Sequence, residues 1–115
     1  MRVKVVGPCA SGKSTLAAGL RELGYDATSA AQDHSYTPDM WQRLNPPDIL
    51  IYLDVTLRSA HERGRKGLGW SQEYLDEQHR RLRHARAYCD LYLPTDGLTE
   101  GQVLAEALNF LRQLD

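Results

Sequence analysis

The chain has 115 residues, of which 42% are hydrophobic, and this composition suits one domain built around one hydrophobic core. Its 14 lysines and arginines nearly balance 15 aspartates and glutamates, and the resulting net charge of −1 argues against a general polyanion-binding protein. No apolar run approaches the roughly 20 residues of a membrane-spanning helix, and the two cysteines form neither a disulfide framework nor a metal-ligand pattern. We therefore expect a cytoplasmic domain whose partners are neither membranes nor nucleic acid.

Residues 1–24 predict a strand, a glycine-rich loop and a helix in succession. Valines dominate residues 2–6, which favours a strand, and leucines recur at helical spacing through 15–23, with Gly24 as the expected C-cap. Between these elements, GPCASGKS fits the phosphate-binding pattern G-x-x-x-x-G-K-[ST] at every fixed position. The residues predicted to bind the nucleotide cofactor are Gly7, Pro8, Cys9, Ala10, Ser11, Gly12, Lys13, Ser14 and Thr15.

Each fixed position of this loop has a chemical purpose in phosphate binding. Glycines let the backbone curl so that successive N–H groups point inward, and the positive end of the following helix dipole favours an anion. Lys13 is expected to reach the β- and γ-phosphates of ATP, while the Ser14 hydroxyl is placed to ligate Mg²⁺. A glycine-rich turn that binds nothing is the alternative, and the flanking strand and helix argue against it.

The middle of the chain continues this alternation. Residues 25–31 are weakly strand-like, and Thr37-Pro38-Asp39 opens a short predicted helix over 38–44. After a break at Asn45-Pro46-Pro47, the apolar run 49–53 is typical of a central parallel strand.

The second half of the chain predicts helices on either side of a basic loop, followed by a strand and a final helix. Thr99 and Gln102 form a capping-box pattern that opens the final helix. The other expected elements are a helix over 56–62, a glycine-interrupted basic loop over 64–70, a long helix over 72–89 and a strand over 91–93. The alternation predicts an α/β fold with a small, mainly parallel sheet of about four strands flanked by helices.

The order of these motifs resembles that of P-loop nucleoside and nucleotide kinases, and is closest in style to thymidylate-kinase-like enzymes. The similarity covers the phosphate loop, the strand at 47–55, the arginine-bearing segment 58–66 and the closing strand and turn at 91–97. This resemblance implies a three-layer P-loop NTPase fold, ATP and Mg²⁺ as cofactors, and transfer of the γ-phosphoryl group to a small-molecule acceptor. The stretch where such enzymes usually carry acceptor-binding elements is short here, because only 24 residues lie between Gly24 and Ile49.

Two aspartates compete for the role of the Mg²⁺ ligand or catalytic carboxylate. Asp33 follows the weak second strand, where the family places its functional acid, and is the preferred residue for Mg²⁺ or for orienting the acceptor hydroxyl. Asp54 ends the apolar strand and is the alternative metal ligand, although the matching residue in the family mostly leads into the next helix. A turn or helix-entry role for Asp33 also stays open.

Arg63 and Arg65 are the basic residues expected to act in catalysis, by stabilising charge on the transferring phosphoryl group. Neighbouring glycines would let this segment close as a lid, and a solvated basic loop is the alternative. The arginines of residues 72–89 are read as a solvated helix face supported by the pair Glu77 and Arg81. Trp41 and Trp70 are more typical of core residues than of base-stacking ones.

Two functions therefore follow from the sequence. The first is a small ATP-dependent phosphotransferase, and the second is a nucleotide-binding switch or slow ATPase that phosphorylates no acceptor. The identity of the acceptor and the choice between ATP and GTP stay open, and so does the oligomeric state, since a homodimer would be one way to complete an acceptor site.

Overall fold

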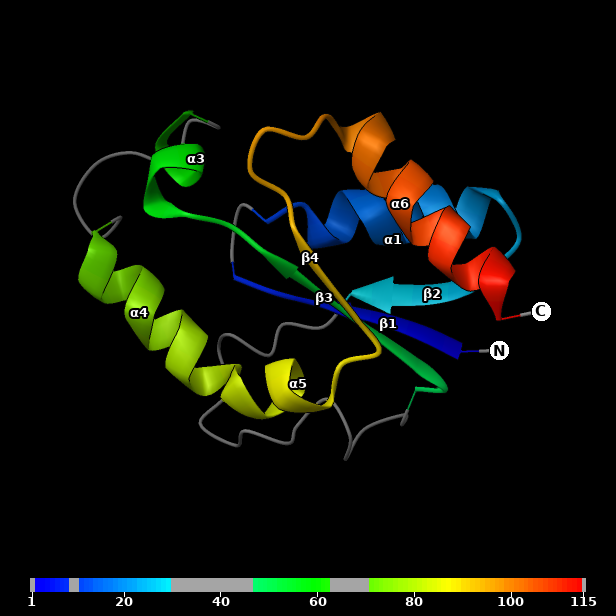
Figure 1. Cartoon of the computed structure of the whole chain (residues 1–115), viewed down its shortest axis with the longest axis horizontal. Coiled ribbons are helices and arrows are strands. Elements are labelled where there is room, and N and C mark those ends of the chain that lie inside the picture. Colours follow the sequence, from blue (N-terminus) through cyan, green and yellow to red (C-terminus); the bar gives the residue numbers. More distant parts are fainter. Residues whose placement is uncertain (1, 9–10, 30–46, 63–70, 115) are drawn as a thin grey trace.

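The computed structural model of the chain describes residues 2–8, 11–29, 47–62 and 71–114, and shows an α/β fold (Figure 1). Four parallel strands form one sheet in the order β2-β1-β3-β4. The strands are β1 (Arg2–Val6), β2 (Asp26–Ser29), β3 (Ile49–Asp54) and β4 (Leu91–Pro94), and the helices are α1 (Lys13–Glu22), α3 (Leu57–Glu62), α4 (Gln72–Arg81), α5 (Arg83–Tyr88) and α6 (Glu100–Gln113). The expected small parallel sheet flanked by helices is confirmed.

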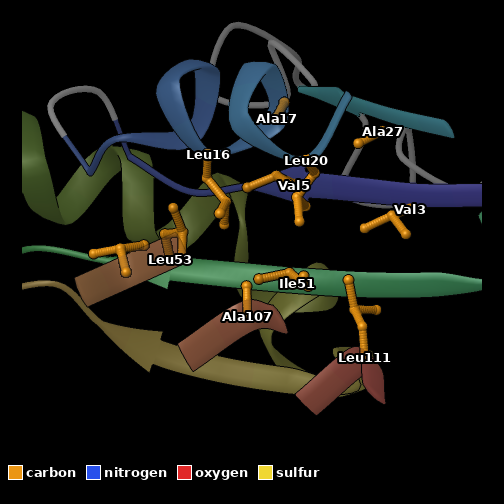
Figure 2. Close-up of a cluster of buried hydrophobic side chains, with 11 residues drawn as sticks. Val3, Val5, Leu16, Ala17, Leu20, Ala27, Ile51, Leu53, Ala107 and Leu111 are labelled. Carbon is orange, nitrogen blue, oxygen red and sulfur yellow. The ribbon is translucent and has the colours of Figure 1, made fainter. Parts of the chain in front are cut away.

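One face of the sheet is covered by α1 and α6. Alternate residues of the central strands point to this side, among them Val5 of β1 and Ile51 of β3, which are paired in register. Figure 2 shows them together with buried side chains of both helices, including Leu16 of α1 and Ala107 of α6. These buried contacts hold α1 against the sheet, next to the loop that follows β1.

The opposite face is covered by the end of α4 and by α5. The intervening residues of the central strands, Val6, Leu50 and Tyr52, pack there against Leu82 and Ala85, and all five are buried. The strict alternation between the two faces follows from the two-residue period of a strand. Because the strands are parallel, the segments that follow β1, β3 and β4 all leave the sheet at its carboxyl edge.

Helix α1 begins two residues earlier than the leucine pattern predicts, at Lys13, and ends as expected. Gly24 adopts φ 94° after the helix, and its N–H and that of Tyr25 bond the carbonyls of Arg21 and Leu20. This pair of bonds is a Schellman motif, which satisfies carbonyl groups that the helix end leaves open. The predicted role of Gly24 is confirmed.

The single helix predicted over 72–89 is wrong, because the chain breaks it into α4 and α5 at Leu82. The backbone there has φ −97° and ψ 1°, outside the helical region, although the N–H of Leu82 still bonds the carbonyl of Gln78. Buried Leu75, Leu82 and Ala85 continue through the break. Side-chain periodicity alone therefore gives no signal of the bend.

Some of the remaining predicted elements are described by the structure, and others lie in the ranges that it does not describe. The helix over 56–62, the strand over 91–93 and the capping box of Thr99 and Gln102 are confirmed within a residue. The predicted helix over 38–44, the loop over 64–70 and the end of the predicted strand 25–31 lie outside the described residues. Among the helices that are described, none has both the length and the apolar character needed to cross a bilayer.

Candidate phosphate-binding site

Gly7, the first residue after β1, is held where no side chain fits. A Cβ atom at this position would lie 2.2 Å from the carbonyl oxygen of Leu53 and 2.8 Å from Oγ of Ser11. Both distances are far shorter than a normal van der Waals contact, so a larger residue would push the loop away from β3. Glycine therefore lets the loop start directly against the end of the neighbouring strand.

Gly12 places the start of α1 and leaves it without a side-chain cap. Its φ of 93° and ψ of 16° lie in the left-handed region, which favours glycine, and its carbonyl accepts the first helical bond from the N–H of Leu16. Within the described residues no side chain caps α1, whereas Ser71 caps α4 and Thr99 caps α6. The N–H groups of the first helical turn, which have no carbonyl partner within the helix, and the helix dipole thus give the loop a positive partial charge suited to an anion.

Lys13 adds a full positive charge to this arrangement. Its Nζ donates a hydrogen bond of 3.0 Å to the carbonyl oxygen of Gly7, so the side chain folds back over the loop. Ser11 is buried below, with 1% exposure, and its Oγ has no hydrogen-bond partner among the residues that the structure describes. Of the other predicted nucleotide-binding residues, Pro8 is buried, whereas Cys9 and Ala10 lie outside the described part.

Ser14 and Thr15 are exposed in the first turn of α1. Oγ of Ser14 lies 3.5 Å from Oγ of Ser29, which ends the neighbouring strand β2. These hydroxyl oxygens suit Mg²⁺, which is usually held by one or two protein groups together with substrate phosphates and water. In the described residues, no cluster of three histidine, cysteine or acidic side chains would hold a metal alone.

The predicted residues Asp33, Arg63 and Arg65 lie outside the described part of the chain, so their roles stay predictions. The end of β2 does bring residue 29 to Ser14, and Asp33 follows only four residues later in the sequence. Arg58, the third arginine of the predicted lid, is exposed on α3.

Asp54, the alternative metal ligand, has a carboxylate that is already engaged by three groups. Oδ1 lies 2.6 Å from Nε2 of His79 on α4, and Oδ2 accepts a 2.5 Å hydrogen bond from the hydroxyl of Tyr92 on β4. The backbone N–H of Val55 also donates to Oδ1. The carboxylate is 13% exposed and lies on the sheet face that α4 covers. Asp54 therefore links β3, β4 and α4.

The surroundings of Asp54 shift two pKa values in opposite directions. Burial by itself raises the pKa of Asp54, but the hydrogen bonds from His79, Tyr92 and Val55 outweigh it and lower the pKa below its usual value. Burial, helped by the hydrogen bond to Asp54 and its negative charge, raises the pKa of Tyr92 to about 12. At neutral pH the pair is thus a carboxylate and a neutral phenol.

Thr95, directly after β4, ties the loop to the strand ends. Its hydroxyl lies 3.1 Å from the carbonyl oxygen of Ser11 and 3.0 Å from that of Asp54, and its N–H donates to the same Asp54 carbonyl. The residue is 1% exposed, so water competes little for these bonds. Thr95 therefore connects the loop after β1 to the end of β3.

A second link joins the segments that follow β3 and β4. The N–H and hydroxyl of Thr56 both donate to Oδ1 of Asp96, at 2.9 and 2.7 Å. Burial alone raises the pKa of Asp96, yet the hydrogen bonds from Ser59 and Thr56 lower it overall. These hydrogen bonds thus connect the segments after β3 and β4 at the carboxyl ends of the strands, next to the loop.

His79, Tyr92 and Thr95 are the residues of this edge that sequence reasoning missed. Thr95 carries a usable signal, since it is a small hydroxyl residue immediately after a predicted strand. His79 lies in a run of basic residues, where solvation is the ordinary explanation, and nothing local connects it to Asp54, 25 positions earlier. Comparison with known proteins finds no family model that matches the chain and no curated protein with significant similarity to it.

Proposed function

We propose that the chain binds ATP with Mg²⁺ at the loop formed by residues 7–15 and transfers the γ-phosphoryl group to a small acceptor. The observation that carries this proposal is the position of Lys13, whose ammonium group bonds the Gly7 carbonyl across a loop that ends at an uncapped helix N-terminus. Amide donors, a helix dipole and a mobile cation then favour the same anion. The match to the phosphate-loop pattern supports the same conclusion.

In the proposed reaction, an acceptor oxygen forms a bond to the γ-phosphorus while the bond between that phosphorus and the β,γ-bridging oxygen breaks. The electron pair stays on ADP, and the acceptor proton passes to Asp33 or to water. Mg²⁺, when bound, neutralises charge on the β- and γ-phosphates. Lys13 and the loop amides position the phosphates, and Ser14 would supply a hydroxyl ligand.

One observation favours a second function, a nucleotide-binding switch or slow ATPase. Only 24 residues separate Gly24 from Ile49, which leaves little chain for an acceptor site. In that function, water takes the place of the acceptor and inorganic phosphate is released. A scan of nucleosides, nucleotides and sugars for ADP production separates the two, since only a phosphotransferase shows ADP formation that depends on one acceptor class.

Replacing Lys13 by alanine tests the phosphate site itself. Loss of the ammonium group should weaken binding of Mg²⁺·ATP at least tenfold in calorimetry, because a charge-assisted contact is worth about 1.5–3 kcal/mol. Arg112→Ala, which removes an exposed cation near the far end of α6, is the matched control and should leave affinity unchanged. Equal ATP affinity in the parent and in Lys13→Ala would contradict the proposal.

A further inference from the structure

The turn that follows β4 contacts both the phosphate loop and α3. Its first residue, Thr95, reaches the carbonyl of Ser11 in the loop, and the next residue, Asp96, reaches the start of α3. The turn itself is closed by a 3.1 Å hydrogen bond from the N–H of Leu98 to the carbonyl of Thr95, with Gly97 at φ 74°. Two neighbouring residues of one turn therefore link the loop to α3.

The Asp96 carboxylate lies at the start of α3 and accepts hydrogen bonds from it. The N–H and the hydroxyl of Thr56 donate to Oδ1, at 2.9 and 2.7 Å, and the side chain of buried Ser59 also hydrogen-bonds to this carboxylate. Helix α3 has six residues and no acidic residue in its first turn, and helices shorter than about 12 residues are marginal alone in water. The orientation of α3 is therefore set by groups outside it, and Asp96 supplies the negative charge that favours its N-terminus.

Helix α3 carries Arg58, which is exposed and belongs to the first turn of the helix. Arg58 follows Asp54 by four residues, and the carbonyl of Asp54 shares the Thr95 hydroxyl with the phosphate loop. Four residues span at most about 14 Å, so Arg58 stays near the edge of the sheet where the loop lies. Among the arginines of the basic segment 58–66, Arg58 is the one that the structure describes. The orientation of α3 therefore decides where this cation lies relative to bound phosphates.

We infer that Asp96 is a positioning residue for the proposed phosphoryl transfer, and that it holds α3 so that Arg58 is directed toward the transferring phosphate. This inference rests on the proposed function. A cation at such a position stabilises charge that develops in the transition state, and a misplacement of about 1 Å can slow a reaction about a hundredfold. Phosphate binding itself uses the loop and Lys13, and the loop keeps its bond to Thr95 when the Asp96 side chain is changed. Loss of the carboxylate should therefore slow turnover and leave ATP affinity nearly unchanged.

The test measures ADP formation, with the acceptor that the scan identifies or with water alone, and the Kd for Mg²⁺·ATP by calorimetry. Asp96→Ala removes the carboxylate and should lower kcat at least tenfold, with the Kd within about twofold of the parent. Asp96→Asn keeps one oxygen to accept the hydrogen bonds from Thr56 and should keep kcat within about threefold. If thermal unfolding shows that the alanine variant does not fold, Thr56→Val, which removes one of these bonds, replaces it and should lower kcat several-fold. Glu106→Ala, which removes an exposed carboxylate of α6, is the control and should leave both quantities unchanged.

A second comparison asks whether Asp96 acts through Arg58. Arg58→Gln should lower kcat, and adding Asp96→Ala to it should lower kcat by less than a further twofold, because both changes remove the same interaction. Unchanged kcat in the folded Asp96 variant, losses that multiply in the double variant, or an equal loss of ATP affinity would each overturn the inference, even with Lys13→Ala behaving as proposed. A parent that forms no ADP with any acceptor or with water would instead overturn the proposed transfer and this inference with it.

Discussion

Asp54 accepts hydrogen bonds from a helix, a neighbouring strand and the following residue, so its carboxylate has a positional role that its place at a strand end does not reveal. The Asp54 carboxylate is only 13% exposed and already accepts three hydrogen bonds. Binding a metal ion there would break some of these hydrogen bonds and so cost stability. The geometry of Asp54 thus argues against it as a ready Mg²⁺ ligand, and the role of Asp33, which lies outside the described residues, stays a prediction.

Replacing Asp54 by asparagine should destabilise the fold by about 1–3 kcal/mol, because a charged acceptor with several donors is lost. Denaturant unfolding measures this difference, and Asp26→Asn, at an exposed position of β2, is the control. ATP affinity should change little. A variant as stable as the parent would show that the network contributes nothing measurable.

The pH dependence of this difference follows from the lowered pKa of Asp54. A carboxyl group whose pKa is lower in the folded state than in the unfolded state stabilises the fold above its ordinary pKa of about 4, and loses that contribution as the pH falls through the lowered value. The stability gap between the parent and Asp54→Asn should therefore shrink below about pH 4. A constant gap from pH 7 to pH 3 would assign the loss to changed packing rather than to charge.

Asp33→Asn provides the complementary test in the same assay. If Asp33 serves Mg²⁺ or the acceptor, the substitution should abolish turnover with little loss of thermal stability. Asp54→Asn should retain more of the turnover rate once its stability loss is taken into account. Equal or reversed losses would move the catalytic carboxylate to Asp54.

At the level of the elements, local signals in the sequence identify those parts whose conformation is set locally. The capping box at Thr99, the C-terminal glycine at position 24 and the alternating β-branched strand Arg2–Val6 all follow from neighbouring residues, and each was predictable. The bend at Leu82 was not, because the buried positions keep helical spacing across it. A bend that leaves the spacing of the buried positions unchanged has no signature in single-sequence periodicity.

The same distinction applies to the candidate site. The loop is predicted as a phosphate site from sequence alone, because phosphate binding requires fixed residue types at fixed spacing. The contacts of His79, Tyr92 and Thr95 join residues 25 to 84 positions apart, and only the order and register of the strands bring them together. Sequence reasoning on one chain gives the parallel sheet, but not which side chains meet at its edge.

Thr95 follows β4, and its hydroxyl lies within hydrogen-bond distance of the carbonyls of Ser11 in the loop and Asp54 in β3. Valine has nearly the same shape as threonine and lacks this hydroxyl. Thr95→Val should cost about 1–2 kcal/mol of stability, since the Ser11 carbonyl loses its hydroxyl donor while the Asp54 carbonyl keeps the backbone N–H of residue 95, and should weaken ATP binding by loosening the loop. Thr95→Ser keeps the hydroxyl and should stay close to the parent in both respects. A valine variant as stable as the parent, with a loss confined to the serine variant, would point to the methyl group and not to the hydrogen bonds.

At the scale of the whole molecule, the strand ends around the candidate phosphate site converge because the strands are parallel. The ends of β1, β2 and β3 bring Gly7, Ser29 and Asp54 to one edge, and α1 starts from the same edge with its uncapped N-terminus. This convergence is the usual reason why ligands bind at the carboxyl ends of strands in α/β folds. In the described part of the loop, Lys13 is the residue that carries a positive charge. Further positive charge to neutralise the transferring phosphoryl group would come from other segments of the chain.

Arg63 and Arg65 are the residues that the sequence offers for that charge, and their proposed role makes a prediction about rate rather than affinity. A lid arginine stabilises charge that grows in the transition state, whereas a surface arginine contributes only weak attraction that salt screens. Changing both residues to glutamine should therefore lower the turnover rate at least a hundredfold, and weaken ATP binding by much less. The control is Arg83→Gln with Arg112→Gln, which removes two exposed charges and should leave the rate unchanged. Unchanged turnover in the first variant would leave Arg63 and Arg65 as ordinary surface charge. The switch function would then gain support, because a domain of this size has few other basic groups to neutralise a transferring phosphoryl group.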